Sequence, residues 1–278
     1  YSDENSDYIG TTSGFIKGYI ENKVINYDDI PYAKPPTGSL RWKAPRELQN
    51  QNQIIKKKDD NHCVQEPSSM GGVPGEEIFT GTEDCLYLDI KTPKRNKQQL
   101  LPVMFWIHGG GNTSGLKDIY DFSKMVHKHD VIVVTINYRL GAFGWFTHPA
   151  IQEFHDGLDK TSNFGTLDII SALEWVNKNI SLFKGNPNNI TIFGESAGAH
   201  NVLSLLVSKN SKGLFHKAIS MSGYTESISL KDAYKQDKQT STSNYSSWEV
   251  VNKIANDKLI ENKKYSRNEL REILYNIS

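Results

Sequence analysis

The stretch Gly194-Glu195-Ser196-Ala197-Gly198 constrains the fold more than any other feature of this chain. It is a G-x-S-x-G pentapeptide between a short β-branched run, 189–193, and a longer apolar run, 199–207. That context predicts a strand that ends in a sharp turn and exposes the serine at the head of a helix. Glycines flank the serine because such a turn leaves no room for side chains. Ser196 is therefore predicted to be a nucleophile, and the alternative is a structural turn serine.

A second glycine-rich segment, His108-Gly109-Gly110-Gly111, directly follows the apolar run 102–107, which is typical of a buried strand. A glycine triplet after a strand presents bare backbone N–H groups to whatever approaches it. In α/β-hydrolases such a loop supplies oxyanion-hole donors, together with the amide that follows the nucleophile. The donors here would be the amides of Gly110, Gly111 and Ala197, each worth on the order of 10²–10³ in rate. The alternative is an ordinary glycine-rich turn.

Charge and hydropathy exclude several classes of protein. The 278 residues carry 32 basic and 32 acidic side chains, so nothing favours binding to nucleic acid. The run Lys56-Lys57-Lys58 is followed by Asp59-Asp60 and is interpreted as a solvated loop. No apolar run approaches the roughly 20 residues of a membrane span. No cluster of metal ligands or cofactor motif is recognisable, so no cofactor or metal is expected. The partner expected from the nucleophile and oxyanion motifs, together with the resemblance given below, is a small-molecule ester.

Strand-like and helix-like segments alternate from residue 86 onward. Strands are expected at 86–90, 103–107, 131–136, 189–193 and 218–222, and helices at 118–129, 163–180, 199–207, 248–255 and 267–275. Nearer the N-terminus, 14–25 alternates around Glu21-Asn22 and predicts a hairpin. The rhythm predicts one α/β domain over residues 1–278, with a mostly parallel central sheet flanked by helices. Residues 224–278 are expected to form a polar, helical tail of the same domain.

These residues together resemble the type-B carboxylesterase family, the cholinesterase-like esterases with an α/β-hydrolase fold. The resemblance covers roughly residues 14–223. The matching motifs are Phe183, Gly185, Ile190, Ile192 and Gly194 before the serine; Glu83-Asp84-Cys85-Leu86-Tyr87-Leu88; Pro31-Tyr32-Ala33 with Arg41 and Trp42; Asn137-Tyr138-Arg139-Leu140-Gly141; Asn163, Gly165, Leu167 and Asp168; and Leu214-Phe215-His216-Lys217-Ala218-Ile219. Lys184 departs from the Gly or Arg that the family usually has there.

The resemblance implies a role for each candidate site residue. Ser196 would be the acyl-accepting nucleophile, with the oxyanion-hole residues named above and Glu195 as a supporting carboxylate. Cys63 and Cys85, which by number alone are weak evidence for a bridge, would form the first of the family's disulfides. That pairing implies a secreted or lumenal protein. Five N-x-S/T sequons, at Asn112, Asn179, Asn189, Asn244 and Asn276, make it a candidate glycoprotein, with Asn244 as the expected acceptor.

The substrate class follows from departures from the cholinesterase branch. There, the loop between the two cysteines carries a tryptophan that stacks on a quaternary ammonium group. Here that loop contains no tryptophan, and Phe79 is its only aromatic residue. Asn112 also replaces the bulky apolar residue usual after the glycine triplet. A general carboxylesterase is therefore expected, rather than an enzyme with a choline site.

The acid and the histidine of a catalytic triad are not recognisable. In α/β-hydrolases they follow the serine in the order acid, then histidine, and the resemblance implies that both lie beyond residue 278. His200 and His108 are expected to be structural, His216 to lie at a strand entry, and the earlier histidines to lie on loops or helix surfaces. The chain begins with Tyr1 and has no signal segment, so a processed product or a piece of a longer protein is expected.

Two functions are consistent with this sequence. The first is the N-terminal half of a serine carboxylesterase, close to inactive as a lone chain. The second is a non-catalytic, cholinesterase-like adhesion or binding protein, although such relatives commonly lose the nucleophile that this chain retains.

Overall fold

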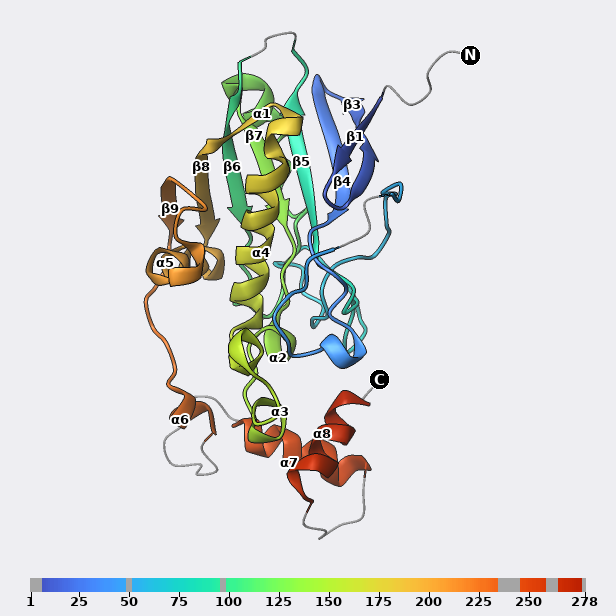
Figure 1. Ribbon diagram of the computed structural model, residues 1–278, viewed down its shortest axis with the longest axis vertical. Helices are drawn as coiled ribbons and strands as arrows, with labels where there is room; N and C mark the ends of the chain where they lie inside the picture. Colours follow the sequence, from blue (N-terminus) through green and yellow to red (C-terminus); the bar gives the residue numbers. More distant parts are fainter. Residues whose placement is uncertain (1–6, 49–51, 96–98, 235–245, 259–264, 277–278) are drawn as a thin grey trace.

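The computed structural model describes residues 7–48, 52–95, 99–234, 246–258 and 265–276. Its main feature is a seven-stranded sheet in the order β3-β4-β5-β7-β6-β8-β9 (Figure 1). The strands are β3 (Tyr19–Glu21), β4 (Val24–Pro31), β5 (Tyr87–Pro93), β7 (Ile132–Ile136), β6 (Leu101–Ile107), β8 (Gly185–Glu195) and β9 (Lys217–Met221). A separate two-stranded hairpin joins β1 (Tyr8–Thr11) to β2 (Gly14–Lys17).

The sheet has a parallel half and an antiparallel half. Strands β7, β6, β8 and β9 pair in parallel, whereas β3, β4 and β5 are added in antiparallel pairings. A strand forms at each of the five expected positions, as β5, β6, β7, β8 and β9. The runs that form β6 and β7 are almost wholly apolar, as expected of strands buried on both faces. The expected N-terminal hairpin is β3–β4, whose turn uses Asn22 and Lys23 at positive φ, 50° and 66°.

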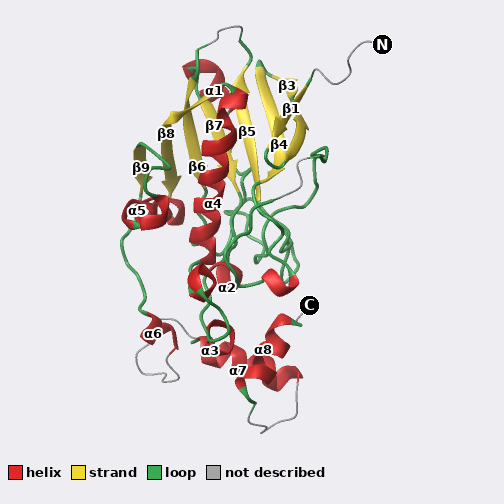
Figure 2. Cartoon of the chain, in the orientation of Figure 1, coloured by secondary structure: helices red, strands yellow, loops and turns green. Residues whose placement is uncertain are grey.

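Helices cover both faces of the sheet (Figures 1 and 2). The longest, α4 (Phe164–Asn179), packs Leu173 and Val176 into the main core. The shorter α1 (Ser123–His129) packs Val126 against Val133 in a smaller cluster. Because Val134, the residue beside Val133 on β7, belongs to the main core, the two helices cover opposite faces.

The remaining helices connect the strands or follow the sheet. They are α2 (Gly141–Gly144), α3 (Pro149–Gln152), α5 (Ala197–Val207), α6 (Leu230–Tyr234), α7 (Ser247–Lys258) and α8 (Arg267–Tyr275), with short 3₁₀ turns at Gly38–Leu40, Gly157–Lys160, Ile180–Phe183 and Lys209–Ser211. The two expected helices of the tail are α7 and α8, and α8 begins with a reciprocal Ser266–Glu269 capping box. No helix among the described residues is both long enough and apolar enough to span a membrane.

One expectation from the sequence was wrong in detail. The helix expected over 118–129 begins only at Ser123; before it, the Ile119 N–H donates to the carbonyl of Leu116 in a turn, and the Asp121 side chain accepts from the Ser123 N–H. His148 and His155 lie on loops, one of the two expected settings, but are buried, with exposed fractions of 0% and 6%. His148 accepts a hydrogen bond from the backbone of Ala150 and contacts the ring of Trp248 on α7.

Candidate active site

The two glycine-rich motifs meet because their strands are neighbours. Strands β6 and β8 pair in parallel, and Ile107 at the end of β6 is opposite Gly194 at the end of β8. The chain leaves both strands at the same edge of the sheet. The loop after β6, residues 108–112 (the glycine loop), therefore lies against the turn after β8. This is the edge at which open α/β sheets carry their ligand sites.

Ser196 occupies the sharp turn that the sequence predicts. Its φ of 55° and ψ of −121° form a conformation that an L-residue adopts only under strain. The turn is held by the Ser196 N–H, which donates to the carbonyl of Met221 on β9 at 2.9 Å, and by the N–H of His200, which donates to the Ser196 carbonyl at 3.0 Å. The residue is half-buried and directly precedes α5.

Glycine is required at the contact between the two loops. A Cβ on Gly109 would lie 2.7 Å from the carbonyl oxygen of Glu195 and 3.3 Å from the Cβ of Ser196. A Cβ on Gly198 would lie 2.1 Å from the carbonyl oxygen of Ile107. The backbone of the glycine loop therefore approaches the serine more closely than any side chain would allow.

The backbone of the glycine loop is turned by its own hydrogen bonds. The carbonyl of Gly110 accepts from the backbone N–H groups of Thr113 and Ser114, both at 3.0 Å. Within the described part of the chain, the N–H groups of Gly110, Gly111 and Ala197 donate to no other residue. The structure thus places all three predicted donors on the two segments that meet at Ser196 and leaves these N–H groups unused by the protein.

His108 is a fixed, neutral support for this loop. Its ring is stacked on Tyr138 at a centroid distance of 4.4 Å, and Nδ1 lies 2.9 Å from the carbonyl of Gly109. Burial lowers the pKa of His108 to about 4, so the ring stays neutral at pH 7 and Nδ1–H donates to that carbonyl. The Tyr138 hydroxyl donates to the carbonyl of His108 at 2.7 Å. The sequence prediction that His108 is structural agrees with these contacts.

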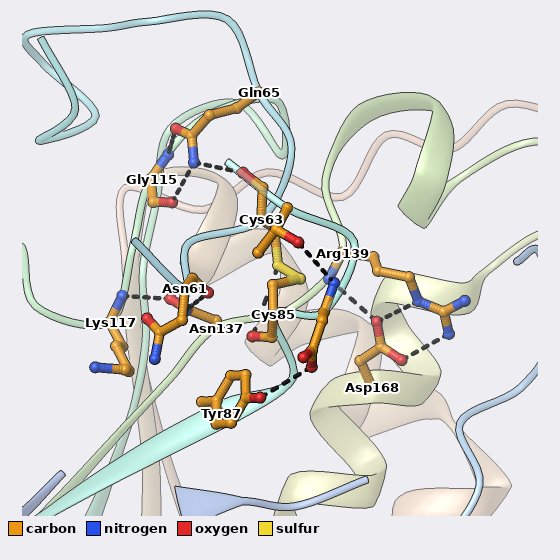
Figure 3. The surroundings of a disulfide bond; sticks show 12 residues. Asn61, Cys63, Gln65, Cys85, Tyr87, Gly115, Lys117, Asn137, Arg139 and Asp168 are labelled. Atoms are coloured by element: carbon orange, nitrogen blue, oxygen red, sulfur yellow. Dashed lines mark hydrogen bonds and ion pairs between the residues drawn. A yellow bond between two sulfur atoms is a disulfide. The ribbon is translucent and has the colours of Figure 1, made fainter. Parts of the chain in front are cut away.

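The disulfide between Cys63 and Cys85 belongs to a segment that contacts Gly115, four residues beyond the glycine triplet (Figure 3). Two residues beyond Cys63, the Gln65 side chain accepts from the Gly115 N–H at 2.8 Å and donates to the Gly115 carbonyl at 3.0 Å. This pair of hydrogen bonds joins the disulfide-bonded segment to the loop that follows the glycine triplet.

Sequence reasoning missed a buried cluster of charges centred on Lys117. The Lys117 ammonium contacts carboxylates of Asp29 at 2.9 Å and of Asp89 and Asp118 at 2.8 Å each. The side chains of Lys117, Asp29 and Asp89 are almost fully buried, with exposed fractions of 3–4%. The Lys117 N–H also donates to the side chain of Asn137 at 2.7 Å (Figure 3). No sequence signal brings these residues together, because they come from three distant segments.

A second buried ion pair explains part of the family motif. Arg139 binds Asp168 of α4 through Nε at 2.8 Å and Nη2 at 2.7 Å (Figure 3). Exposed fractions are 3% for Arg139 and 0% for Asp168. The pair fixes the segment after β7 against the N-terminal part of α4.

Histidines and carboxylates near the serine do not complete a triad. Glu195 is half-buried beside Gly109, and its Oε2 lies 3.1 Å from the position of a Cβ on that glycine. The Nδ1 atom of His200 lies 2.6 Å from the Tyr224 carbonyl, and the two rings stack. His216 lies at the entry to β9, as expected, and accepts from the Ile190 N–H at 3.2 Å. Among the described residues, no histidine side chain is hydrogen-bonded to Ser196.

The sheet is open at β9, next to the serine. In the described part of the chain β9 pairs only with β8, at the edge of the sheet (Figure 1). All five of its residues are exposed. Apolar side chains gather there: Ile219 and Met221 on β9 are 45% and 38% exposed, and Leu206 and Val207 on α5 are 54% and 84% exposed. A cavity of about 310 Å³ lined by Ser13, Tyr32 and Trp175 involves none of the candidate site residues.

Several sequons have engaged side chains. The Asn179 amide is 1% exposed and donates to Thr12 Oγ1 and to the carbonyl of Trp175. The Asn112 side chain is bonded to Asn201. Asn244, the expected glycan acceptor, lies outside the described residues.

This fold is an α/β-hydrolase fold. It has parallel strands β6 and β8 at its core, a strained serine between β8 and α5, and helices on both faces of the sheet. The sequence profile of the Carboxylesterase family matches residues 5–268. The chain therefore belongs to the carboxylesterase family, a family of carboxylic ester hydrolases.

Curated relatives and solved structures agree with this assignment. The chain is 40% identical over 230 residues to para-nitrobenzyl esterase of Bacillus subtilis, a match that covers 81% of this chain and 45% of the relative. It is 40% identical over 208 residues to acetylcholinesterase of Danio rerio, covering 72% of this chain and 32% of the relative. The structure of a thermophilic PNB esterase superposes with a TM-score of 0.79 at 33% identity, covering 98% of this chain and 51% of that one. The chain thus spans about half the length of these relatives, or less.

Proposed function

We propose that this chain carries the nucleophile and the oxyanion hole of a serine carboxylesterase. The observation that carries the proposal is the approach of the glycine loop to the serine, with 3.3 Å between a Cβ position on Gly109 and the Cβ of Ser196. The unused N–H groups of Gly110, Gly111 and Ala197 lie on the same two segments. Hydrogen-bond donors held ready in this way stabilise the negative oxygen of a tetrahedral intermediate.

The proposed reaction is a two-step acyl transfer. The Ser196 oxygen attacks the ester carbonyl carbon, and its proton passes to a general base. The carbonyl oxygen becomes an oxyanion held by the three amides, after which the C–O bond breaks and the alcohol leaves with that proton. Water then attacks the acyl-enzyme and releases the carboxylic acid. Glu195 is proposed as a carboxylate that supports the site from beside the serine.

The general base and its orienting acid are proposed to come from a part of the fold that this chain does not contain. The open edge at β9 and the exposed Leu206 and Val207 are the surface against which that part would pack. As a lone chain, residues 1–278 are expected to be close to inactive, because loss of the base lowers turnover by about 10⁶.

The proposed substrates are general carboxylic esters rather than choline esters. The segment between the two cysteines has Phe79 as its only aromatic side chain, and this ring is 60% exposed. It offers no enclosed aromatic face for a quaternary ammonium group. We further propose passage through the secretory pathway, consistent with the Cys63–Cys85 disulfide, and glycosylation at Asn244. A mass loss on enzymatic deglycosylation that is absent from Asn244→Gln would support the glycan, and no loss would contradict it.

Two measurements test the esterase proposal. Residues 1–278 alone should hydrolyse p-nitrophenyl acetate at the background rate, and robust turnover that disappears in Ser196→Ala would contradict the requirement for a missing base. The chain joined to the C-terminal part of the Bacillus subtilis para-nitrobenzyl esterase should be labelled at Ser196 by a fluorophosphonate, with Ser196→Ala as the control. A folded fusion that resists labelling would favour the alternative function, a non-catalytic binding protein.

A further inference from the structure

One side-chain contact bridges the glycine loop and the helix that carries the serine. Asn112, the residue after the glycine triplet, is half-buried and has a left-handed φ of 59°. Its Oδ1 accepts a hydrogen bond from Nδ2 of Asn201 at 2.8 Å. Its backbone carbonyl accepts from the Gly141 N–H at 2.7 Å. Asn112 is therefore held by two different elements at once.

Asn201 is suited to hold the loop because it does not move independently of the serine. It lies on α5, five residues after Ser196, and is 2% exposed. Because α5 begins directly after Ser196, the position of the serine turn fixes the position of each residue on this short helix. A hydrogen bond from Asn201 to Asn112 consequently sets the distance between the serine and the C-terminal end of the glycine loop.

Tyr138 secures the other end of the same loop. Its hydroxyl donates to the carbonyl of His108 at 2.7 Å and lies 3.4 Å from Oδ1 of Asn112. The loop is thus fastened at both ends, at His108 by Tyr138 and at Asn112 by Asn201. Within the described ranges, the hydrogen bond from Asn201 to Asn112 is the one that joins this loop, through side chains, to the helix of the nucleophile. An asparagine in place of the usual bulky apolar residue after the glycine triplet is what makes this polar bridge available.

We propose that Asn201 is a positioning residue for the active site. Through Asn112 it keeps the amides of Gly110 and Gly111 at a fixed distance from Ser196, where an oxyanion would form. This inference rests on the proposed function for its catalytic meaning, but the mechanical link between helix and loop stands without it. Because an oxyanion exists only after attack on the carbonyl, loss of the link should weaken binding of a tetrahedral adduct rather than uptake of an ester.

Hydrogen exchange of residues 1–278 tests the mechanical link directly. In Asn201→Ala, amide exchange in the segment 107–114 should be faster by about tenfold, the effect of losing one buried hydrogen bond. Ser204→Ala, a half-buried polar residue on the same helix, is the matched control and should leave this segment unchanged. Asn112→Ala and the double variant Asn112→Ala/Asn201→Ala complete a double-mutant cycle. Alanine at position 112 is strained by its left-handed φ, but this strain is present in both variants that carry it and cancels in the coupling energy. The two effects should be non-additive, so that removing Asn201 changes little once Asn112 is gone.

Binding of phenylboronic acid to the fusion with the C-terminal part of the Bacillus subtilis para-nitrobenzyl esterase, followed by ¹¹B NMR, tests the positioning role. A tetrahedral boronate on Ser196 should bind about tenfold more weakly to Asn201→Ala, whereas Ser204→Ala should bind as the unaltered chain does. Unchanged exchange in Asn201→Ala, or additive effects in the cycle, would overturn the inference. So would equal boronate affinity in the two variants. Absence of any boronate adduct on the folded, unaltered fusion would count against the proposed esterase site and against the positioning role, and the exchange data would still decide the link.

Discussion

The neutral imidazole of His108 should make the stability of this fold depend on pH in the mildly acidic range. Burial lowers its pKa from the ordinary value of 6.5 to about 4. Between these two values the unfolded chain binds more protons at this site than the folded chain does. The stabilising contribution of His108 is therefore fully present above pH 6.5 and is lost progressively as the pH falls toward 4.

The magnitude follows from the two pKa values. At pH 5 the unfolded imidazole is almost fully protonated and the folded one is mostly neutral, which lowers the free energy of unfolding by about 2 kcal/mol relative to pH 7. Well below pH 4 the loss approaches about 3 kcal/mol. Either value is a large share of the roughly 5–15 kcal/mol that stabilises a typical domain.

Urea unfolding at pH 7 and pH 5 measures this effect. His108→Asn keeps an N–H that can donate to the Gly109 carbonyl but does not titrate. Between the two pH values, the unaltered chain should lose about 2 kcal/mol more than the variant, because contributions from other groups, including His148, cancel in the difference. Equal losses in both proteins, or an imidazole of His108 that titrates near pH 6.5 by NMR, would refute the reasoning.

Three further substitutions test the packing around the site. Lys117→Met should lower the free energy of unfolding, measured in urea, by about 3–5 kcal/mol, because it leaves buried carboxylates unpaired. Asp118 is partly exposed, so Asp118→Asn should lower it by at most about 1 kcal/mol. Equal losses in the two variants would contradict this reasoning. Ser196→Gly should raise stability by about 1–2 kcal/mol through relief of backbone strain, and a variant no more stable than the unaltered chain would contradict the strain. Gly115→Ala would place a Cβ 2.3 Å from Nδ1 of His108, so its midpoint temperature of thermal unfolding should lie well below that of Gly213→Ala, where nothing lies within 4 Å of the added Cβ. Similar midpoints for the two variants would refute the clash.

The sequence predicts the elements of this fold well wherever periodicity alone decides them. The run 131–136 is apolar throughout and forms β7, and the three- and four-residue spacing over 163–180 forms α4. The start of α1 was missed because the residues before Ser123 form turns with local hydrogen bonds, which the apolar periodicity does not reveal. The antiparallel addition of β3, β4 and β5 likewise depends on strand pairing, which no single segment encodes.

The same distinction holds for the candidate site. The adjacency of Ser196 to the glycine loop could be expected, because each motif marks the end of a buried strand and such strands pair in parallel. The bridge from Asn201 to Asn112 could not, since it depends on the exact rotation of α5 against the loop. The buried positions of His148 and His155 were also beyond prediction, because the helices that cover them come from the far end of the chain.

One side of β9 has no pairing partner among the residues that the structure describes, and this affects how the polypeptide behaves in concentrated solution. Its sequence, Lys217 to Met221, carries a single charge, and that charge is at one end of the strand. A bare row of peptide groups with apolar side chains is a template on which other extended segments can add, from one molecule to the next. Colloidal stability of the chain therefore depends on whether this strand is covered, and dilution or a capping segment should keep molecules separate.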